Sequence, residues 1–364
     1  TMKNDLISPI LEEQIKENAL LNFSKETPLN RRAKLDLGKG CNRHCSFCYY
    51  ETQLSSKDWL IPENARTLVS GLLDNGITQI ELSGGEPTMN PYYFDIIDTI
   101  KEEFTKRGMQ HYITIVTNGW FGINDMSIRK HCKDLKEVLI SLHGTESKHN
   151  SIVKNKMAHA YIENILKYLR VSKLIVRMNF VVYKDNLDKD AIEMLYSFIK
   201  NGNIQQLNLL PLNFWSDAQN QKQEIDIKLQ QEQLEAFLKK YEESYSTNFL
   251  NEIGFNARKY WHGINIRYHS YCQLQEKYHK YIVNHYDHIF DLSDWNKIYY
   301  PKDLNPDEQK LNNFGLKFED IYTIKEINLS NSILQASKDR LISHYKTKEC
   351  RSCEYNSKCD GFKK

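Results

Sequence analysis

Three cysteines near the start of the chain have a spacing that suits a metal centre. Cys41, Cys45 and Cys48 are arranged as C-x3-C-x2-C, and residues 38–40 contain two glycines that let the backbone wrap a bound group. A tetrahedral zinc site would need a fourth protein ligand, for which His44 is available. A cubane iron–sulfur cluster would instead keep one iron without a protein ligand, and chemistry at a metal requires such an open position. The spacing alone leaves both alternatives open.

A second group of cysteines lies near the C-terminal end of the sequence. Cys350, Cys353 and Cys359 fall within ten residues, while Cys132 and Cys272 stand alone. A cytosolic protein with eight cysteines is not expected to carry a disulfide framework, because reducing thiol pools oppose it. Clustered cysteines in that compartment usually indicate metal. We therefore expect a second metal site, and we expect Cys132, on a predicted helix, to be an inert thiol.

Regular elements must position these cysteines, and much of the sequence has a β/α pattern. Residues 33–212 alternate short apolar runs with amphipathic helical stretches. The alternation predicts a parallel sheet covered by helices, as either an open doubly wound sheet or an incomplete barrel. In both architectures ligands bind at the carboxyl ends of the strands. The predicted strands are 34–37, 77–82, 112–116, 137–142, 174–182 and 206–210, and the predicted helices are 62–75, 92–106, 158–171 and 189–200.

Polar motifs stand at several of those carboxyl ends. Residues 83–86 (Ser-Gly-Gly-Glu) follow the second predicted strand, residues 117–119 (Thr-Asn-Gly) the third, and residues 141–144 (Ser-Leu-His-Gly) the fourth. Glycines permit close backbone approach to a ligand, and the carboxylate of Glu86 offers an acceptor to an ammonium group. Taken singly, each motif is also explained by turn chemistry or by a polar cap at a strand end.

Taken together, the motifs resemble those of the radical S-adenosylmethionine (radical SAM) superfamily. The resemblance rests on the C-x3-C-x2-C spacing, with the aromatic residue Phe47 before its last cysteine, and on the Gly-Gly-Glu segment after the second strand. It implies an α/β fold with a partial (β/α)6 barrel. It also implies that a [4Fe-4S] cluster on Cys41, Cys45 and Cys48 reductively cleaves S-adenosylmethionine (SAM).

The resemblance further assigns side chains to the SAM site. The Gly-Gly-Glu segment would bind the methionine amino group, and either Leu209 or Leu210 would pack on the adenine. His143 replaces the family's usual aspartate. No arginine stands where related enzymes often pair the SAM carboxylate, and Lys154 or Lys156 would be a substitute without bidentate geometry. The implied cofactor-binding residues are Phe47, Ser83, Gly84, Gly85, Glu86, Thr117, Asn118, Ser141, Asn179 and Leu210.

The activity that the resemblance implies is hydrogen abstraction from a substrate. A low-potential electron donor of flavodoxin or ferredoxin type would reduce the cluster, and the 5′-deoxyadenosyl radical from SAM would abstract hydrogen from a small molecule or a peptide. One alternative is a maturase of a ribosomally synthesised peptide that forms a thioether, a C–C crosslink or an epimer. A zinc-binding interaction protein would leave the Gly-Gly-Glu segment unexplained. An electron-transfer iron–sulfur protein would not explain why the cluster has only three local thiolates.

The C-terminal cysteines resemble the auxiliary-cluster segment of the SPASM and Twitch extensions of the superfamily. With Cys272 they would give the four ligands of a second [4Fe-4S] cluster. A structural zinc on the same residues and a three-cysteine cluster with an open iron are the alternatives. An amphipathic stretch over 332–344 leads into these cysteines. The expected domains are an N-terminal extension (1–32), a radical SAM partial barrel (33–215), a linking helix (216–250) and a smaller, loop-rich C-terminal auxiliary-cluster domain (251–364).

The composition is that of a folded protein without a basic or membrane-spanning segment. Hydrophobic residues make up 40% and charged residues 26% of the 364 residues, and the formal net charge is +2. The sequence has no block of like charges, which argues against nucleic-acid binding as the main activity. No apolar run is long enough to span a bilayer, and residues 1–17 are unlike a signal peptide. We therefore expect a cytoplasmic protein that makes no membrane contact.

Overall fold

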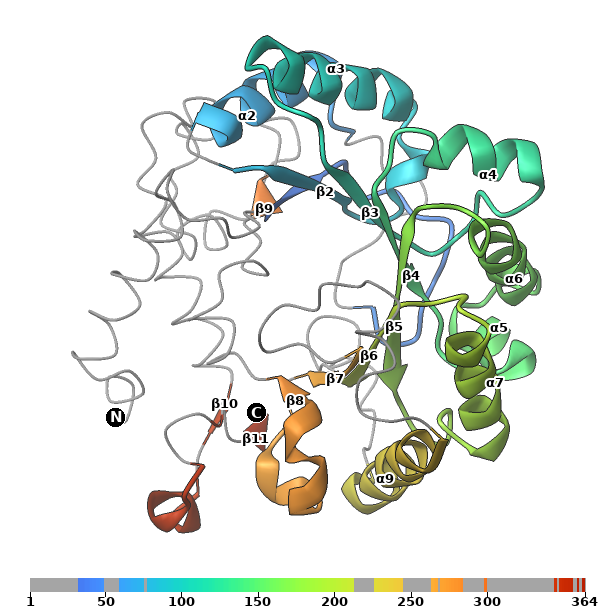
Figure 1. Ribbon diagram of the computed structural model, residues 1–364, viewed down its shortest axis with the longest axis vertical. Helices are drawn as coiled ribbons and strands as arrows, with labels where there is room; N and C mark the ends of the chain where they lie inside the picture. Colours follow the sequence, from blue (N-terminus) through green and yellow to red (C-terminus); the bar gives the residue numbers. More distant parts are fainter. Residues whose placement is uncertain are drawn as a thin grey trace. The chain divides into compact units, whose positions relative to one another are not determined.

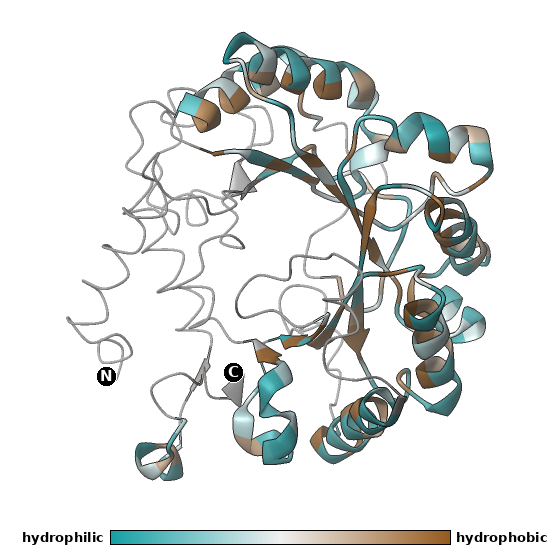
Figure 2. Ribbon diagram, in the orientation of Figure 1, coloured by the Kyte–Doolittle hydropathy of each residue, from teal (hydrophilic) through white to brown (hydrophobic). Residues whose placement is uncertain are grey.

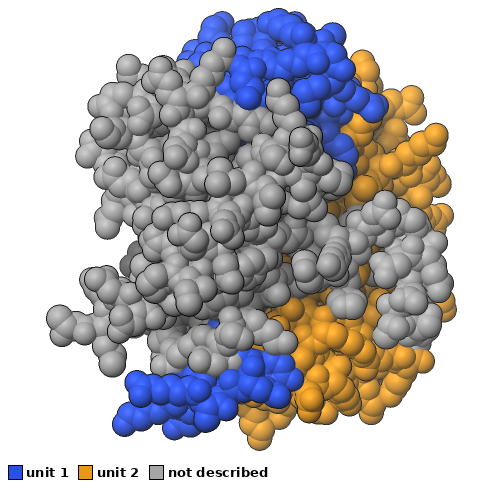
Figure 3. Space-filling view, turned by 60° about the vertical axis from the view of Figure 1, so that its left-hand side comes forward, with its two compact units in different colours: residues 1–40, 55–114, 284–364 blue, residues 41–54, 115–283 orange. Residues whose placement is uncertain are grey.

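The structure is a computed structural model that describes most of the predicted elements. The described residues are 32–48, 59–74, 77–212, 226–244, 263–267, 269–283, 298–299, 344–345, 347–355, 359 and 362–363. The amphipathic stretch expected over 332–344 lies outside the described residues except for its last residue. The chain divides into two compact units, unit 1 with residues 1–40, 55–114 and 284–364, and unit 2 with residues 41–54 and 115–283 (Figure 3).

Unit 1 contains a parallel sheet with two helices (Figure 1). Strand β1 (Arg32–Asp36) pairs with β2 (Gln79–Ser83), so that Asp36 lies opposite Ser83, and with β9 (Ile298–Tyr299). The buried carboxylate of Glu103 accepts hydrogen bonds from Arg66 and Arg107 and thereby ties the two helices together. The helices are α2 (Pro62–Asp74) and α3 (Tyr93–Lys106), and the other described elements are η1 (Pro87–Met89), η8 (Glu349–Ser352) and the antiparallel pair β10 (His344–Tyr345) and β11 (Phe362–Lys363).

Unit 2 contains the β/α repeats that follow. Strand β3 (Ile113–Thr117) belongs to it from Ile115 onward. From β3 to β8 the strands lie side by side in the order of the sequence, and the registered pairs between β4 and β8 are parallel. The strands are β4 (Glu137–Ser141), β5 (Ile175–Val182), β6 (Gln206–Pro211), β7 (Ile264–Arg267) and β8 (Ile282–Val283). The helices are α4 (Asp125–Cys132), α5 (Glu146–Ile152), α6 (Ala158–Leu169), α7 (Lys189–Lys200) and α9 (Ile227–Ser244), with η2 (Tyr271–Gln273) and η3 (Glu276–Tyr281).

The central strands of unit 2 have one apolar face and one polar face. On β5, Met178 and Phe180 are fully buried, and Arg177 and Asn179 alternate with them. Successive side chains of a strand point to opposite faces of the sheet, so one face carries the apolar residues and the other the polar residues. The helices of unit 2 carry their hydrophobic residues on the side toward the strands (Figure 2). Burial of each large apolar side chain contributes about 1.5–3 kcal/mol, and the helices therefore pack on the apolar face.

The fold class expected from the sequence is confirmed, and each predicted strand lies within two residues of an observed one. Helix α7 has the predicted bounds because the carboxylate of Asp188 accepts the backbone N–H of Ala191 at 2.9 Å and caps the helix N-terminus. Helix α5 was not predicted, and of α4 the sequence indicated only that Cys132 lies on a helix, without its bounds. Helices α4 and α5 contain only eight and seven residues, too few to show a clear helical period.

Candidate functional site

The cysteine loop (residues 41–48) is fixed by backbone hydrogen bonds to the end of helix α5. The N–H of Ser46 donates to the carbonyl of Ile152 at 3.0 Å, and the N–H of His44 donates to the carbonyl of Val153 at 3.4 Å. The last carbonyls of a helix have no partner within the helix, so a neighbouring loop can use them as acceptors. The loop is therefore positioned by α5, an element that the sequence analysis did not predict.

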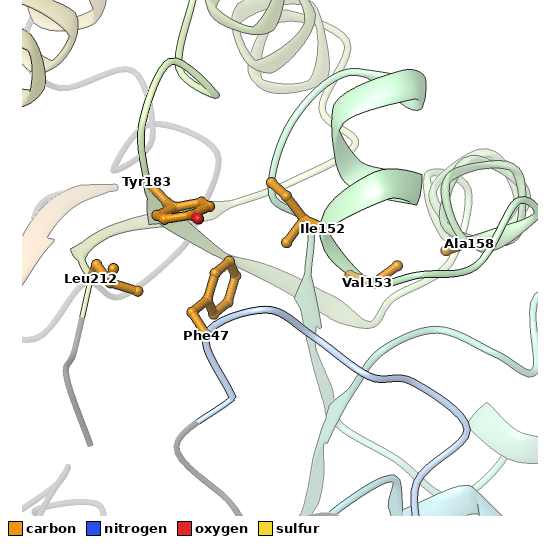
Figure 4. Close-up of a cluster of buried hydrophobic side chains, with 6 residues drawn as sticks. All are labelled: Phe47, Ile152, Val153, Ala158, Tyr183 and Leu212. Atoms are coloured by element: carbon orange, nitrogen blue, oxygen red, sulfur yellow. The ribbon is translucent and has the colours of Figure 1, made fainter. Parts of the chain in front are cut away.

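Phe47 anchors the same loop in the core of unit 2. Its ring packs edge-to-face on His143 at 4.9 Å and on Tyr183 at 5.8 Å between ring centroids. Figure 4 shows Phe47 between Tyr183 and the α5 residue Ile152. Cys45 packs against this cluster. Phe47 thus holds the loop between its second and third cysteines, and the full cluster consists of Phe47, Ile152, Val153, Ala158, Tyr183 and Leu212.

The three cysteine side chains of the loop influence one another. Cys41 is buried, and Cys45 and Cys48 are half-buried. Burial raises the pKa of the Cys45 thiol to about 12, with further contributions from Cys48 and Cys41, while Arg43 opposes them. His44, the possible fourth zinc ligand, is exposed. Among the described residues, no three Cys, His, Asp or Glu side chains gather as ligands of a single ion. A cubane cluster uses a different arrangement, because each thiolate binds a different iron.

Asn118, at the end of β3, reaches the cysteine loop. Its Nδ2 donates to Oδ1 of Asn42 at 2.9 Å and to Sγ of Cys41 at 3.6 Å. Its Oδ1 accepts the backbone N–H of Trp120 at 3.0 Å, which fixes the orientation of the amide. The neighbouring Thr117 is buried, and its Oγ1 accepts a hydrogen bond from the next turn of the chain. Of the predicted Thr-Asn-Gly motif, Asn118 is therefore the residue that contacts a cluster cysteine.

The Gly-Gly-Glu segment lies against the glycine-containing residues that precede the cysteine loop. Within unit 1, Gly85 N–H donates to the carbonyl of Gly38 at 2.9 Å, and Glu86 N–H donates to the carbonyl of Gly40 at 2.8 Å. Gly40 is the residue before Cys41 in the sequence. These hydrogen bonds continue the β1–β2 pairing beyond the ends of both strands. Their acceptors, Gly38 and Gly40, belong to the residues directly before Cys41.

The glycines of this segment are required by the close approach of two backbones. A Cβ on Gly85 would lie 2.2 Å from the carbonyl oxygen of Gly40, and a Cβ on Gly84 would lie 2.5 Å from that of Gly38. Gly84 also has a φ of +125°, which side chains rarely adopt. The sequence analysis explained these glycines by the approach of a ligand. The structure adds a second reason, which is contact with the chain itself.

Glu86 is fully buried and caps the short helix η1. Its Oε1 accepts hydrogen bonds from Oγ1 of Thr88 at 2.6 Å and from the backbone N–H of Thr88 at 3.2 Å. The carboxylate is thus held in one orientation by its own turn.

The remaining predicted side chains of unit 2 lie along the polar face of the strands. Ser141 on β4 is directly opposite Asn179 on β5, and Asn179 is opposite Asn208 on β6. Leu210 is two residues after Asn208 and therefore shares its face, whereas Leu209 is fully buried on the other face. Of the two leucines considered for the adenine contact, Leu210 is the one on the polar face.

His143 is a neutral, buried acceptor. Its Nδ1 accepts the backbone N–H of Val181 at 3.1 Å, and its own backbone N–H donates to Nδ1 of His149 at 3.1 Å. Burial lowers the pKa of His143 to about 3, so the imidazole is uncharged at neutral pH. The residue at the position of the family's usual aspartate therefore joins the ends of β4 and β5. Lys154 and Lys156, the possible partners of the SAM carboxylate, are exposed.

The isolated and C-terminal cysteines have different environments. Cys132 ends α4 and is buried, and burial raises its pKa to about 12, which fits an inert thiol. Cys272 is exposed. In unit 1 the N–H of Cys353 donates to the carbonyl of Cys350 at 3.2 Å, and in unit 2 Cys48 and Cys45 form the same hydrogen bond at 3.2 Å. Each of the two C-x2-C pairs thus forms a turn that is closed by the same kind of backbone hydrogen bond.

Comparison with known proteins relates part of the chain to a known superfamily. The profile of the Radical SAM superfamily matches residues 35–199, which include the cysteine loop and the Gly-Gly-Glu segment. This chain carries a radical SAM domain. Proteins of this superfamily use SAM and a [4Fe-4S] cluster. None of the described helices combines the length and the apolar character that crossing a bilayer requires.

Two curated relatives match the radical SAM domain. A probable GTP 3′,8-cyclase of Sulfurisphaera tokodaii is 25% identical over 174 residues, which are 48% of this chain and 53% of that protein. The antilisterial bacteriocin subtilosin biosynthesis protein AlbA of Bacillus subtilis is 27% identical over 166 residues, 45% of this chain and 36% of that protein. The chain therefore matches about half the length, or less, of these relatives.

A solved structure shares the fold over a longer part of the chain. The structure of native anSMEcpe with bound AdoMet and the Kp18Cys peptide aligns with a TM-score of 0.59 and 16% identity. The alignment covers 91% of this chain and 88% of that one. AdoMet is SAM. The likeness confirms the α/β fold of radical SAM type that the sequence predicted.

Three asparagines of unit 2 were not among the candidate site residues predicted from the sequence. Nδ2 of Asn208 on β6 donates to Oδ1 of Asn179, and Nδ2 of Asn265 on β7 donates to Oδ1 of Asn208. Within the cysteine loop, Oδ1 of Asn42 accepts a hydrogen bond from Nδ2 of Asn118. A signal for Asn208 and Asn265 is present in the sequence. Each lies between two apolar residues in a short alternating run, which places it on the polar face of a half-buried strand.

Proposed function

We propose that this chain is a radical SAM enzyme that reductively cleaves SAM at a [4Fe-4S] cluster held by Cys41, Cys45 and Cys48. The observation that carries the proposal is the geometry of the cysteine loop. The N–H of Cys48 donates to the carbonyl of Cys45 at 3.2 Å, and hydrogen bonds to the end of α5 hold the loop backbone. Three thiolates on one fixed loop fit a cluster that keeps one iron for SAM.

Residues around the loop would orient the cluster and shield it from water. When bound, the cluster supplies one electron to SAM, which divides into methionine and a 5′-deoxyadenosyl radical that takes a hydrogen atom from the substrate. Asn118 donates to the sulfur of Cys41, and Phe47 fills the core beside Cys45. Hydrogen bonds to cluster sulfurs and solvent exclusion set the reduction potential of such clusters.

We assign SAM binding to the ends of strands that follow the cysteines in the sequence. Glu86 is the proposed acceptor for the methionine ammonium, since it is a carboxylate whose orientation is fixed by Thr88 at the end of β2. Asn179 and Leu210 share the polar face of unit 2 and are proposed to contact the nucleoside half. The full proposed set is Phe47, Ser83, Gly84, Gly85, Glu86, Thr117, Asn118, Ser141, Asn179 and Leu210.

The substrate that we propose is a peptide. The name of AlbA describes the biosynthesis of a bacteriocin, and the anSMEcpe structure holds a peptide beside AdoMet. The cyclase relatives match the same part of the chain, so a small molecule is the second candidate. A low-potential flavodoxin or ferredoxin in the cytoplasm is the proposed electron donor. Either substrate class would be recognised by residues outside the conserved cluster chemistry.

We also propose that Cys350, Cys353 and Cys359, together with Cys272, hold a second [4Fe-4S] cluster. The support is that the Cys350–Cys353 pair and the Cys45–Cys48 pair each form a turn closed by the same kind of backbone hydrogen bond. That turn presents two thiols from neighbouring positions, as a shared metal centre requires. A structural zinc on the same residues is the alternative.

The cluster proposal is tested by product analysis under anaerobic conditions. The reconstituted and reduced protein, incubated with SAM, should form 5′-deoxyadenosine, and the Cys45→Ala variant should form none. Cys132→Ala is the matched control, because Cys132 is a buried cysteine outside the cluster loop. A protein loaded with iron that forms no 5′-deoxyadenosine would contradict the proposal.

A further inference from the structure

Three asparagines form a hydrogen-bonded row across the polar face of unit 2. Asn179, Asn208 and Asn265 occupy directly paired positions on β5, β6 and β7. Nδ2 of Asn208 donates to Oδ1 of Asn179 at 2.9 Å, and Nδ2 of Asn265 donates to Oδ1 of Asn208 at 3.1 Å. Asn208 and Asn265 are fully buried, and Asn179 is half-buried. Asn179 is therefore the accessible end of the row.

The row has a direction that fixes the amide of Asn179. If Asn179 alone turned over, its Nδ2 would face the Nδ2 of Asn208, and two donors would oppose each other. If Asn208 turned over, both of its hydrogen bonds would be lost at a buried position. If all three amides turned over together, both bonds would be kept, but the two donors of Asn265 Nδ2 would replace its single oxygen as the unpaired group at the buried end. The observed direction therefore keeps Oδ1 of Asn179 as an acceptor within the row. The Nδ2 of Asn179 forms no hydrogen bond within the described part of the chain and is left for a ligand.

Stability alone does not explain this row. Oδ1 of Asn265, at its buried end, has no hydrogen-bond partner among the described residues. An unsatisfied buried amide oxygen costs about 1–3 kcal/mol, and an apolar side chain at that position would avoid the cost. A polar row that is kept despite such a cost points to a role in binding or orientation.

We infer that Asn208 and Asn265 are positioning residues for the SAM site: they hold the carboxamide of Asn179 as a hydrogen-bond donor to an acceptor oxygen of SAM. The inference rests on the proposed function. Two groups of SAM offer such oxygens, the carboxylate and the ribose. Residues 142–156, which directly follow β4, contain no arginine to pair the carboxylate, and Lys154 and Lys156 are exposed, so a fixed amide donor on β5 supplies chemistry that the site needs.

The experiment measures SAM affinity in the reconstituted protein and the KM for SAM in 5′-deoxyadenosine formation without added substrate. Asn208→Leu should weaken SAM binding about fivefold, with KM raised and kcat unchanged, as expected for one lost hydrogen bond. Asn265→Leu should give a smaller loss in the same direction. Asn203→Leu is the matched control, because Asn203 is a buried asparagine that donates to the Leu166 carbonyl outside the row.

A double-mutant cycle separates positioning from a general effect on packing. In the Asn179→Leu background, Asn208→Leu should cause no further loss of SAM affinity, because it acts through Asn179. A further loss in that background, or unchanged affinity in the single Asn208→Leu variant, would overturn the inference. If Asn208→Leu does not fold, as judged by its thermal melt, Asn208→Ser makes the same test with a smaller polar residue.

Decarboxylated SAM distinguishes the two acceptor groups. A fivefold effect with SAM but none with the decarboxylated compound assigns the carboxylate, and equal effects with both assign the ribose, and either outcome supports the inference. Failure of the proposed function is distinguishable from failure of this inference. In the first case the wild-type protein itself forms no 5′-deoxyadenosine, and in the second the wild-type protein and the Asn208→Leu variant bind SAM equally.

Discussion

Nδ2 of Asn118 lies 3.6 Å from the sulfur of Cys41 and donates a hydrogen bond to it. The amide is oriented by its own loop, because the backbone N–H of Trp120 donates to its Oδ1 at 3.0 Å. The end of β3 is thereby joined to the first cysteine of the loop within unit 2. A sulfur that ligates iron would meet a fixed donor at this point.

Loss of this donor should lower the reduction potential of the cluster. A hydrogen bond to a ligating sulfur stabilises the more negative, reduced state, so its removal favours the oxidised state. Asn118→Leu should therefore shift the midpoint in an EPR-monitored redox titration to a more negative value. Asn201→Leu, at an exposed asparagine after α7, is the control. An unchanged midpoint in Asn118→Leu would show that the contact does not persist in the loaded protein.

Replacement of Gly85 should be far more damaging than replacement of an unconstrained glycine. A Cβ on Gly85 would lie 2.2 Å from the carbonyl oxygen of Gly40, whereas a Cβ on Gly108 would meet nothing within 4 Å. Gly85→Ala should lower the free energy of unfolding by more than about 3 kcal/mol, and Gly108→Ala by about 1 kcal/mol because of its positive φ. Denaturant midpoints of the cluster-free proteins compare the two, and equal losses would argue against the close approach.

The buried state of His143 predicts a loss of stability in acid. Its folded pKa of about 3 lies below the ordinary value of 6.5, so between these pH values only the unfolded chain binds the proton. Stability from this group is complete above pH 6.5 and falls as the pH decreases, by at most about 1.4 kcal/mol per pH unit.

The test is urea unfolding of the cluster-free protein between pH 6.5 and pH 5, a range in which His143 is neutral in the folded state. His149, whose pKa is also lowered by burial, adds to the slope in the wild-type protein and in the variant alike. The free energy of unfolding of His143→Gln should therefore depend less steeply on pH, because this variant takes up fewer protons on unfolding than the wild-type protein. The same slope in both proteins would mean that His143 is not buried as described.

Iron analysis separates the two proposed clusters. The reconstituted wild-type chain should bind about eight iron atoms, and the variant with Cys350, Cys353 and Cys359 replaced by alanine should bind about four. That variant should still form 5′-deoxyadenosine from SAM in the absence of substrate, because Cys41, Cys45 and Cys48 are intact. A wild-type chain with about four iron atoms and one zinc would instead support the structural zinc.

Much of the fold was predictable because its elements have strong local signals. The strands of the β/α repeat are short apolar runs with polar residues at their ends, and the long helices have wide apolar faces or a side-chain cap such as Asp188. The cysteine spacing and the Gly-Gly-Glu segment identified the chemistry. The bounds of α4 and the existence of α5 were not predicted, because short polar helices depend on their tertiary contacts rather than on sequence period.

The roles of individual side chains were harder to predict. Glu86 combines a predicted ligand role with the cap of its own turn, and Phe47 packs in the core rather than only beside a cofactor. Such dual roles depend on contacts between residues distant in the sequence. The row of Asn179, Asn208 and Asn265 likewise depends on strand register, which periodicity does not specify for three separate strands.

The central claim is that three thiolates leave one iron open for SAM, and electron–nuclear double resonance tests it most directly. The protein lacking Cys350, Cys353 and Cys359 is reduced and mixed with SAM that carries oxygen-17 in its carboxylate. We expect an oxygen-17 coupling in the spectrum of the reduced cluster, because the carboxylate would bind the open iron. A reduced [4Fe-4S] spectrum with no such coupling at saturating SAM would contradict it.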